Sequence, residues 1–111
     1  INIGSEIAEL GNPYFGNYAS AKGAMLSLTR SWAKELGPEG ITVNLIAPGW
    51  IPVERHADIP QSNRDWYLDR TPLGHFGKPE DIAAMVVFLA SSKADFITGQ
   101  KFAVNGGRTL L

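Results

Sequence analysis

The feature that most constrains this chain is a short, almost wholly apolar run, Thr42-Val43-Asn44-Leu45-Ile46-Ala47, which ends at Pro48-Gly49. Such a run, rich in β-branched residues, is typical of a strand that is covered on both faces, as in a parallel sheet. Parallel neighbours need long crossover connections, which are usually helices. The run therefore predicts a parallel sheet with helices packed on its faces.

A long helix is predicted before this strand, over residues 17–36. Apolar or aromatic side chains recur there at steps of three and four, which places them on one helical stripe. The members of the stripe are Tyr18, Ala21, Met25, Leu28, Trp32 and Leu36. We expect Asn17 to be the N-cap residue and Gly37-Pro38 to end the helix.

The remaining elements complete an alternating order. Ile1 to Ser5 is an apolar-alternating run typical of the middle of a buried strand, which favours a fragment. A loop follows, in which we expect Glu6 and Glu9 to be solvated. A last helix is predicted over residues 79–90 and a last strand over residues 101–104. The order strand, helix, strand, helix, strand indicates two crossover units of an α/β fold.

The long segment over residues 50–78 forces no continuous regular structure, although a short helix could form over Asn63–Asp69. Loops of this length inside a compact domain are commonly lids or binding segments. Trp50, Trp66 and Tyr67 could shape an apolar substrate pocket under this loop, or they could equally anchor the loop to the core.

Charge and composition weigh against several kinds of partner. Ten basic and eleven acidic residues give a net charge of −1, with no basic stripe for nucleic acid. No apolar run approaches the roughly 20 residues of a membrane span, and cysteine is absent. We expect a cytoplasmic protein with no nucleic-acid or membrane partner. Glu54, His56 and Asp58 suit a polar loop better than a metal site, so no metal is predicted.

Tyr18 and Lys22 indicate acid–base chemistry, because a spacing of four places them on adjacent turns of one helix face. An ammonium group favours the phenolate form of a nearby tyrosine, so the pair could give or take a proton. An aromatic residue at the start of an amphipathic helix is, however, more often part of the core. Ser5 ends the first strand, and Asn44 with Pro48-Gly49 marks the end of the next, so these groups are expected at one sheet edge.

Taken in order, these features resemble the classical short-chain dehydrogenase/reductase family, and the likeness covers nearly the whole chain. The resembling motifs are Ser5 with Tyr18-x-x-x-Lys22, Glu35 to Asn44, Pro48-Gly49, Pro72-Leu73-Gly74, Gly77-Lys78-Pro79-Glu80-Asp81, Phe88-Leu89-Ala90-Ser91, Ile97-Thr98-Gly99-Gln100 and Val104-Asn105-Gly106-Gly107. The resemblance implies a Rossmann-like, doubly wound parallel sheet. Residues 1–111 would be the C-terminal half of a single NAD(P)-binding domain, with the first half and its Gly-x-Gly loop absent.

The resemblance also implies an oxidoreductase that interconverts an alcohol and a carbonyl with NAD or NADP. Tyr18 would be the proton donor and acceptor, Lys22 would favour its phenolate form and bind the nicotinamide ribose, and Ser5 would hold the substrate oxygen. The cofactor would also meet Pro48, Gly49, Trp50 and Ile51, and the small-molecule substrate would meet Ser5, Tyr14, Trp50, Trp66 and Tyr67.

Two departures from the family pattern stand out. Pro52-Val53-Glu54 follows the Pro-Gly pair where many members carry a cofactor-binding threonine, and His75 replaces an arginine after Pro-Leu-Gly. The family resemblance further implies a homodimer or homotetramer and packing with the missing first half. The alternative is a catalytically silent, truncated or proteolysed half that only packs with its missing partner or oligomerises.

Overall fold

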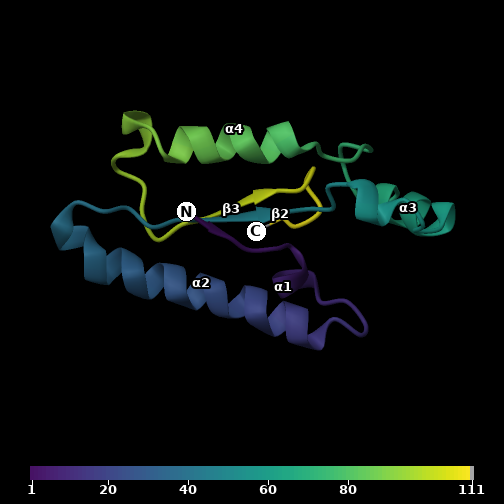
Figure 1. Cartoon of the computed structure of the whole chain (residues 1–111), viewed down its shortest axis with the longest axis horizontal. Coiled ribbons are helices and arrows are strands. Elements are labelled where there is room, and N and C mark those ends of the chain that lie inside the picture. The colour runs from purple at the N-terminus through teal and green to yellow at the C-terminus, as the bar shows by residue number, and fades with distance from the viewer. Residues whose placement is uncertain (111) are drawn as a thin grey trace.

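The computed structural model describes residues 1–110 and consists of a three-stranded parallel sheet between helices (Figure 1). Strands β1 (Asn2–Ile3), β2 (Leu45–Pro48) and β3 (Lys101–Val104) lie in the order β1-β2-β3. Helix α2 (Gly16–Leu36) covers one face of the sheet and helix α4 (Pro79–Leu89) the other. The predicted α/β fold, with helices on both faces of a parallel sheet, is therefore confirmed.

Two short helices lie in the segments between these elements. Helix α1 (Ile7–Leu10) forms where the sequence predicted only a loop. Helix α3 (Gln61–Leu68) is the short helix predicted over Asn63–Asp69, and it begins two residues earlier. Three single turns of 3-10 helix complete the structure, namely η1 (Gly37–Glu39), η2 (Glu54–His56) and η3 (Ser92–Ala94).

The apolar core lies between the sheet and α4. Ile46 of β2 has no exposed surface, and it clusters with Leu89 at the end of α4 and with Ala94. Partly buried residues close the layer around them, namely Ile82, Met85, Val86, Ile97, Phe102 and Val104. Pro79 opens α4 as predicted, and the Asp81 carboxylate accepts a hydrogen bond from the Lys78 amide at 2.7 Å. Helix α4 is thus fixed by its first turn and by its apolar face.

Helix α2 packs on the sheet through a face that overlaps the predicted stripe only in part, since Met25 and Leu36 are half-buried. Tyr18, Leu28 and Trp32 are exposed, whereas Thr29 and Ala33 are buried. Thr29 Oγ1 accepts a hydrogen bond at 2.9 Å from Asn2, which lies in β1. The predicted stripe was wrong in part because close approach between a helix and a strand selects small side chains over large apolar ones.

The predicted start of α2 also differs in detail. Phe15 occupies the N-cap position, and Asn17 lies inside the first turn, where it caps nothing. The helix instead begins where the Ala19 amide donates to the Phe15 carbonyl at 2.8 Å.

Asn44 lies at the opposite edge of the sheet from the one that was predicted, because β2 begins at Leu45 and not at Thr42. Asn44 is 2% exposed. Its Nδ2 donates to the Ile97 carbonyl at 2.8 Å, and its Oδ1 accepts from the Gln100 amide at 3.0 Å. The Asn44 side chain therefore joins the start of β2 to the turn that precedes β3.

We predict that Asn44→Ala lowers the free energy of unfolding by about 1–3 kcal/mol, because two buried or partly buried backbone groups lose their hydrogen-bond partner. Urea unfolding followed by circular dichroism measures this change. Asn17→Ala is the control, and we expect it to change stability by less than about 0.5 kcal/mol because the side chain is exposed and caps nothing. Equal stability losses in the two variants would contradict the structural role of Asn44.

Candidate active site

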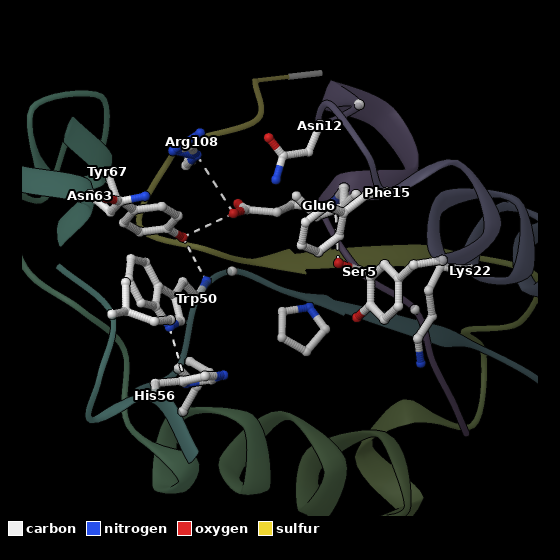
Figure 2. A pocket seen from close by; sticks show the side chains of 18 of the residues that line it. Ser5, Glu6, Asn12, Phe15, Lys22, Trp50, His56, Asn63, Tyr67 and Arg108 are labelled. Carbon is white, nitrogen blue, oxygen red and sulfur yellow. Dashed lines mark hydrogen bonds and ion pairs between the residues drawn. The ribbon is translucent and has the colours of Figure 1, made fainter. Parts of the chain in front are cut away.

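A pocket of about 750 Å³ lies at the carboxyl ends of β1 and β2. Figure 2 shows Ser5, Phe15 and Lys22 on one side of this pocket, and Trp50, His56 and Tyr67 on the other. The first group comes from the end of β1 and from the start of α2 with the residue before it. The second comes from the segment that follows β2 and from α3. The pocket thus joins segments that are distant in the sequence.

The parallel register explains this convergence. Ile3 pairs with Ile46, and Pro48 pairs with Val104. The ladder continues beyond the strands, since the Glu6 amide donates to the Pro48 carbonyl at 3.1 Å. Segments that follow parallel strands leave the sheet at one edge, which is where open α/β sheets bind their ligands.

The three predicted catalytic residues, Ser5, Tyr18 and Lys22, all line this pocket. Ser5 is buried, and its Oγ accepts a hydrogen bond from the Ile7 amide at 3.2 Å. Lys22 Nζ donates to the Ile3 carbonyl at 2.9 Å and lies 5.8 Å from the centre of the Tyr18 ring. The end of β1 therefore fixes both the serine and the ammonium group that accompanies the tyrosine.

The residues predicted to contact the cofactor lie in the same pocket. They are Pro48, Gly49, Trp50 and Ile51, together with Tyr18 and Lys22. The hydrogen bond from the Gly49 amide to the Val104 carbonyl, at 3.0 Å, extends the β2–β3 ladder and holds the start of this segment.

Of the predicted substrate residues, Trp50, Trp66 and Tyr67 line the pocket with Ser5, but Tyr14 does not. Tyr14 is fully exposed, and its φ of 67° places its backbone in the left-handed region. Tyr14 therefore lies outside the pocket that the other predicted site residues line.

The two interpretations of the aromatic residues prove compatible. The Trp50 ring packs in a T-shaped arrangement with Tyr67 and with Phe76, at centroid distances of 5.4 and 5.1 Å. Tyr67 stacks on Phe76 at 5.5 Å. Trp50 and Tyr67 thus line the pocket and also hold the long loop in place. Trp66 is half-exposed, and the centre of its ring lies 5.0 Å from the Arg108 guanidinium carbon.

Glu6 is a pocket residue that the sequence analysis wrongly placed among solvated side chains. It is 3% exposed, its Oε1 accepts a hydrogen bond from the Tyr67 hydroxyl at 3.0 Å, and the same oxygen lies 3.5 Å from Arg108 Nε. Burial raises the pKa of Glu6, although the Tyr67 hydrogen bond and the Arg108 charge act against that rise. Glu9, by contrast, pairs with Lys101 at the surface.

The position of Glu6 directly after Ser5, at the end of a predicted strand, was the one signal that could have found it. Arg108 follows Gly106-Gly107 in the loop after β3, where no periodicity or spacing points to it. Glu6 Oε2 and Arg108 Nη1 are buried and find no hydrogen-bond partner among residues 1–110. Such a buried ion pair contributes little to stability, because the desolvation of both charges offsets their attraction.

Tyr67 is chemically distinct from Tyr18. Burial raises the pKa of Tyr67 to about 12, and the nearby Glu6 carboxylate acts in the same direction. Its hydroxyl accepts a hydrogen bond from the Trp50 amide at 2.6 Å while it donates to Glu6. Tyr67 therefore keeps its proton at neutral pH and acts as a hydrogen-bonding group, not as a base.

The structure also bears on metals and membranes. His56 Nδ1 accepts hydrogen bonds from Trp50 Nε1 and from the Val53 amide, both at 3.2 Å, so this nitrogen is already occupied. Within residues 1–110, no three His, Asp or Glu side chains form a group that could hold a metal ion. No helix in the same residues is long and apolar enough to cross a membrane.

We predict that Glu6→Gln changes how stability depends on pH. The folded protein binds the Glu6 proton more tightly than the unfolded chain does, so the wild type loses stability relative to the variant as pH rises above 4.5. Urea unfolding of both proteins at several pH values between 4.5 and about 7 measures this difference. Stability curves that stay parallel over this range would contradict the burial of an ionisable carboxyl.

Comparison with known proteins supplies the family. The model of a family described as enoyl-(acyl carrier protein) reductase matches residues 1–109. The 3-oxoacyl-[acyl-carrier-protein] reductases FabG of Thermotoga maritima and Pseudomonas aeruginosa are 41% and 44% identical over 107 residues. These alignments cover 96% of this chain but 44% and 43% of the two reductases. The chain thus spans less than half the length of these curated relatives.

Two solved structures share the fold. A crystal structure from Brucella melitensis, titled short-chain dehydrogenase/reductase SDR:glucose/ribitol dehydrogenase, matches with a TM-score of 0.90 and 36% identity, over 98% of this chain and 44% of its own. A short-chain type dehydrogenase/reductase from Mycobacterium ulcerans matches with a TM-score of 0.89 and 38% identity, over 96% and 39%. The predicted Rossmann-like fold is therefore confirmed, and the chain belongs to the short-chain dehydrogenase/reductase family.

Proposed function

We propose that this chain forms the substrate and nicotinamide side of an NAD(P)-dependent oxidoreductase that interconverts a ketone and an alcohol. The observation that carries the proposal is one pocket at the sheet edge, lined by Ser5, Tyr18 and Lys22. The curated relatives are named as reductases of 3-oxoacyl groups, which supports carbonyl reduction. A short-chain ketone, a sugar, a steroid or an acyl thioester are the substrate classes to assay.

The donors in the pocket fit a nicotinamide nucleotide. An ammonium group has three N–H donors, and Lys22 uses one of them on the Ile3 carbonyl. The Ile51 amide donates no hydrogen bond to any of residues 1–110. Lys22 would therefore bind the ribose hydroxyls and Ile51 the carboxamide oxygen. When bound, the cofactor supplies the hydride, while the protein supplies orientation and proton transfer.

The three polar side chains divide the work in carbonyl reduction. The Ser5 hydroxyl would donate to the carbonyl oxygen and stabilise the negative charge that develops there. Tyr18 would transfer its phenolic proton to that oxygen, and Lys22 would stabilise the resulting phenolate. The same groups act in reverse in alcohol oxidation, where Tyr18 accepts the proton.

Residues 1–111 contain no Gly-x-Gly sequence, so the pyrophosphate of the cofactor would need another part of the complete enzyme. Their match to less than half of each curated relative favours the second candidate, namely that these residues are catalytically silent by themselves. Nicotinamide absorbance assays of residues 1–111 and of the complete protein, with the same panel of substrates, test both candidates. Turnover by residues 1–111 alone would contradict their silence.

We predict that Tyr18→Phe in the complete protein lowers turnover about 10²- to 10⁴-fold, because the proton donor is lost. The affinity for the cofactor should change little, since the phenyl ring keeps its place beside Lys22. Absorbance of the reduced nicotinamide measures turnover, and fluorescence titration measures cofactor binding. Lys22→Met is the comparison, and we expect it to lower both turnover and cofactor affinity. Near-normal turnover in Tyr18→Phe would refute the proposed role.

A further inference from the structure

The Tyr67 hydroxyl connects the two strand ends that form the pocket. It accepts a hydrogen bond from the Trp50 amide at 2.6 Å and donates one to Glu6 Oε1 at 3.0 Å. Glu6 directly follows Ser5, and Trp50 lies in the segment proposed to face the cofactor. Figure 2 shows the two contacts meeting at the same phenol oxygen. One side chain of α3 therefore bridges the ends of β1 and β2.

We propose that Tyr67 is a positioning residue of this enzyme. Its hydroxyl holds the segment over residues 48–51 against the Ser5–Glu6 end of β1 and thereby sets the affinity for the nicotinamide end of the cofactor. This inference rests on the proposed function, but it assigns Tyr67 no part in the proton transfer. Tyr67 was expected to meet the substrate, and this inference gives its hydroxyl a structural task instead.

The Tyr67 ring is held on several sides, so its hydroxyl has little freedom to find other partners. Tyr67 is 7% exposed. Phe76 stacks on the ring with an interplanar angle of 16°, Trp50 meets it at 90°, and the Arg108 guanidinium lies 4.3 Å from its centre. The orientation of the phenol oxygen is thus fixed by packing before any ligand binds.

Gly49 shows how closely the hydroxyl fits the segment. A Cβ atom at position 49 would lie 2.5 Å from the Tyr67 hydroxyl oxygen and 2.8 Å from Asn105 Cβ. Real Cβ atoms are not found so close to other heavy atoms, so a side chain at this position would displace the phenol or the segment. Because Gly49 has no side chain, the Tyr67 hydroxyl can approach the Trp50 amide closely enough to accept its hydrogen bond.

Loss of the hydroxyl would release both strand ends. The Trp50 amide has no other acceptor among residues 1–110, and Glu6 Oε1 would lose its hydrogen bond from the phenol. The segment would then sample more conformations, and cofactor binding would have to order it again. The net worth of one such hydrogen bond corresponds to an affinity change of up to about tenfold.

The experiment uses the complete protein with NADH and NADPH as probes. We expect Tyr67→Phe to raise the Kd and the KM of the preferred cofactor about tenfold while kcat changes less than about threefold. Glu6→Ala should give a similar loss of affinity, and it is the second variant should Tyr67→Phe fail to fold. The double variant should bind the cofactor only slightly more weakly than either single variant, because the two residues act through one contact.

Thr71→Val is the matched control. Thr71 is buried, and its hydroxyl donates to the Tyr67 carbonyl at 2.8 Å, so the variant removes a buried hydrogen bond at the end of α3 and leaves the phenol contacts intact. We expect it to lower thermal stability without changing the cofactor Kd. The proposal is overturned if Thr71→Val weakens cofactor binding as much as Tyr67→Phe, or if folded Tyr67→Phe and Glu6→Ala bind like the wild type. A wild type that binds neither cofactor would refute the proposed function as well.

Discussion

The parallel ladder of β1, β2 and β3 is the constraint on which the site depends, because it makes three distant segments leave the sheet at the same edge. Hydrogen bonds from Gly4 to Ile46 at 2.7 Å and from Glu6 to Pro48 at 3.1 Å carry the β1–β2 ladder past the strand itself. Lys22 donates to the last carbonyl of β1, so the ladder also determines where helix α2 presents its ammonium group. A shift of β1 relative to β2 would move Ser5 and Lys22 away from the segment over residues 48–51.

The buried cluster of Glu6, Tyr67 and Arg108 lies at this edge, and removing its charges from water costs free energy. A carboxylate with so little exposure is poorly solvated, which raises its pKa, and its attraction to Arg108 offsets only part of that cost. The same burial keeps the proton on Tyr67, whose hydroxyl then bridges two backbone segments. The pocket therefore combines an accessible phenol on α2, proposed for proton transfer, with a buried phenol on α3 that fixes the geometry.

Local patterns predicted most of the fold. The apolar run around Ile46 and the periodicity of α2 and α4 are short-range signals, and the structure contains the corresponding elements with boundaries shifted by at most three residues. The predictions failed where the environment decided the outcome. The large apolar residues Leu28 and Trp32 face outward on α2, while Thr29 and Ala33 allow the close contact with the sheet. Asn44 lies just before β2, at the end opposite to the pocket, where its side chain bonds to Ile97 and Gln100.

By itself, the sequence determined the α/β class and the order of the main elements, and it singled out Ser5, Tyr18 and Lys22 as candidate site residues, because spacing along a helix and the ends of strands are local properties. Only the tertiary structure decided that Glu6 is buried, that Tyr14 lies outside the pocket and that Tyr67 bridges two strand ends. Glu6 and Tyr67 are 61 residues apart. Whether a carboxyl is solvated or buried depends on neighbours brought to it by chain closure over such distances, and no local pattern encodes those neighbours.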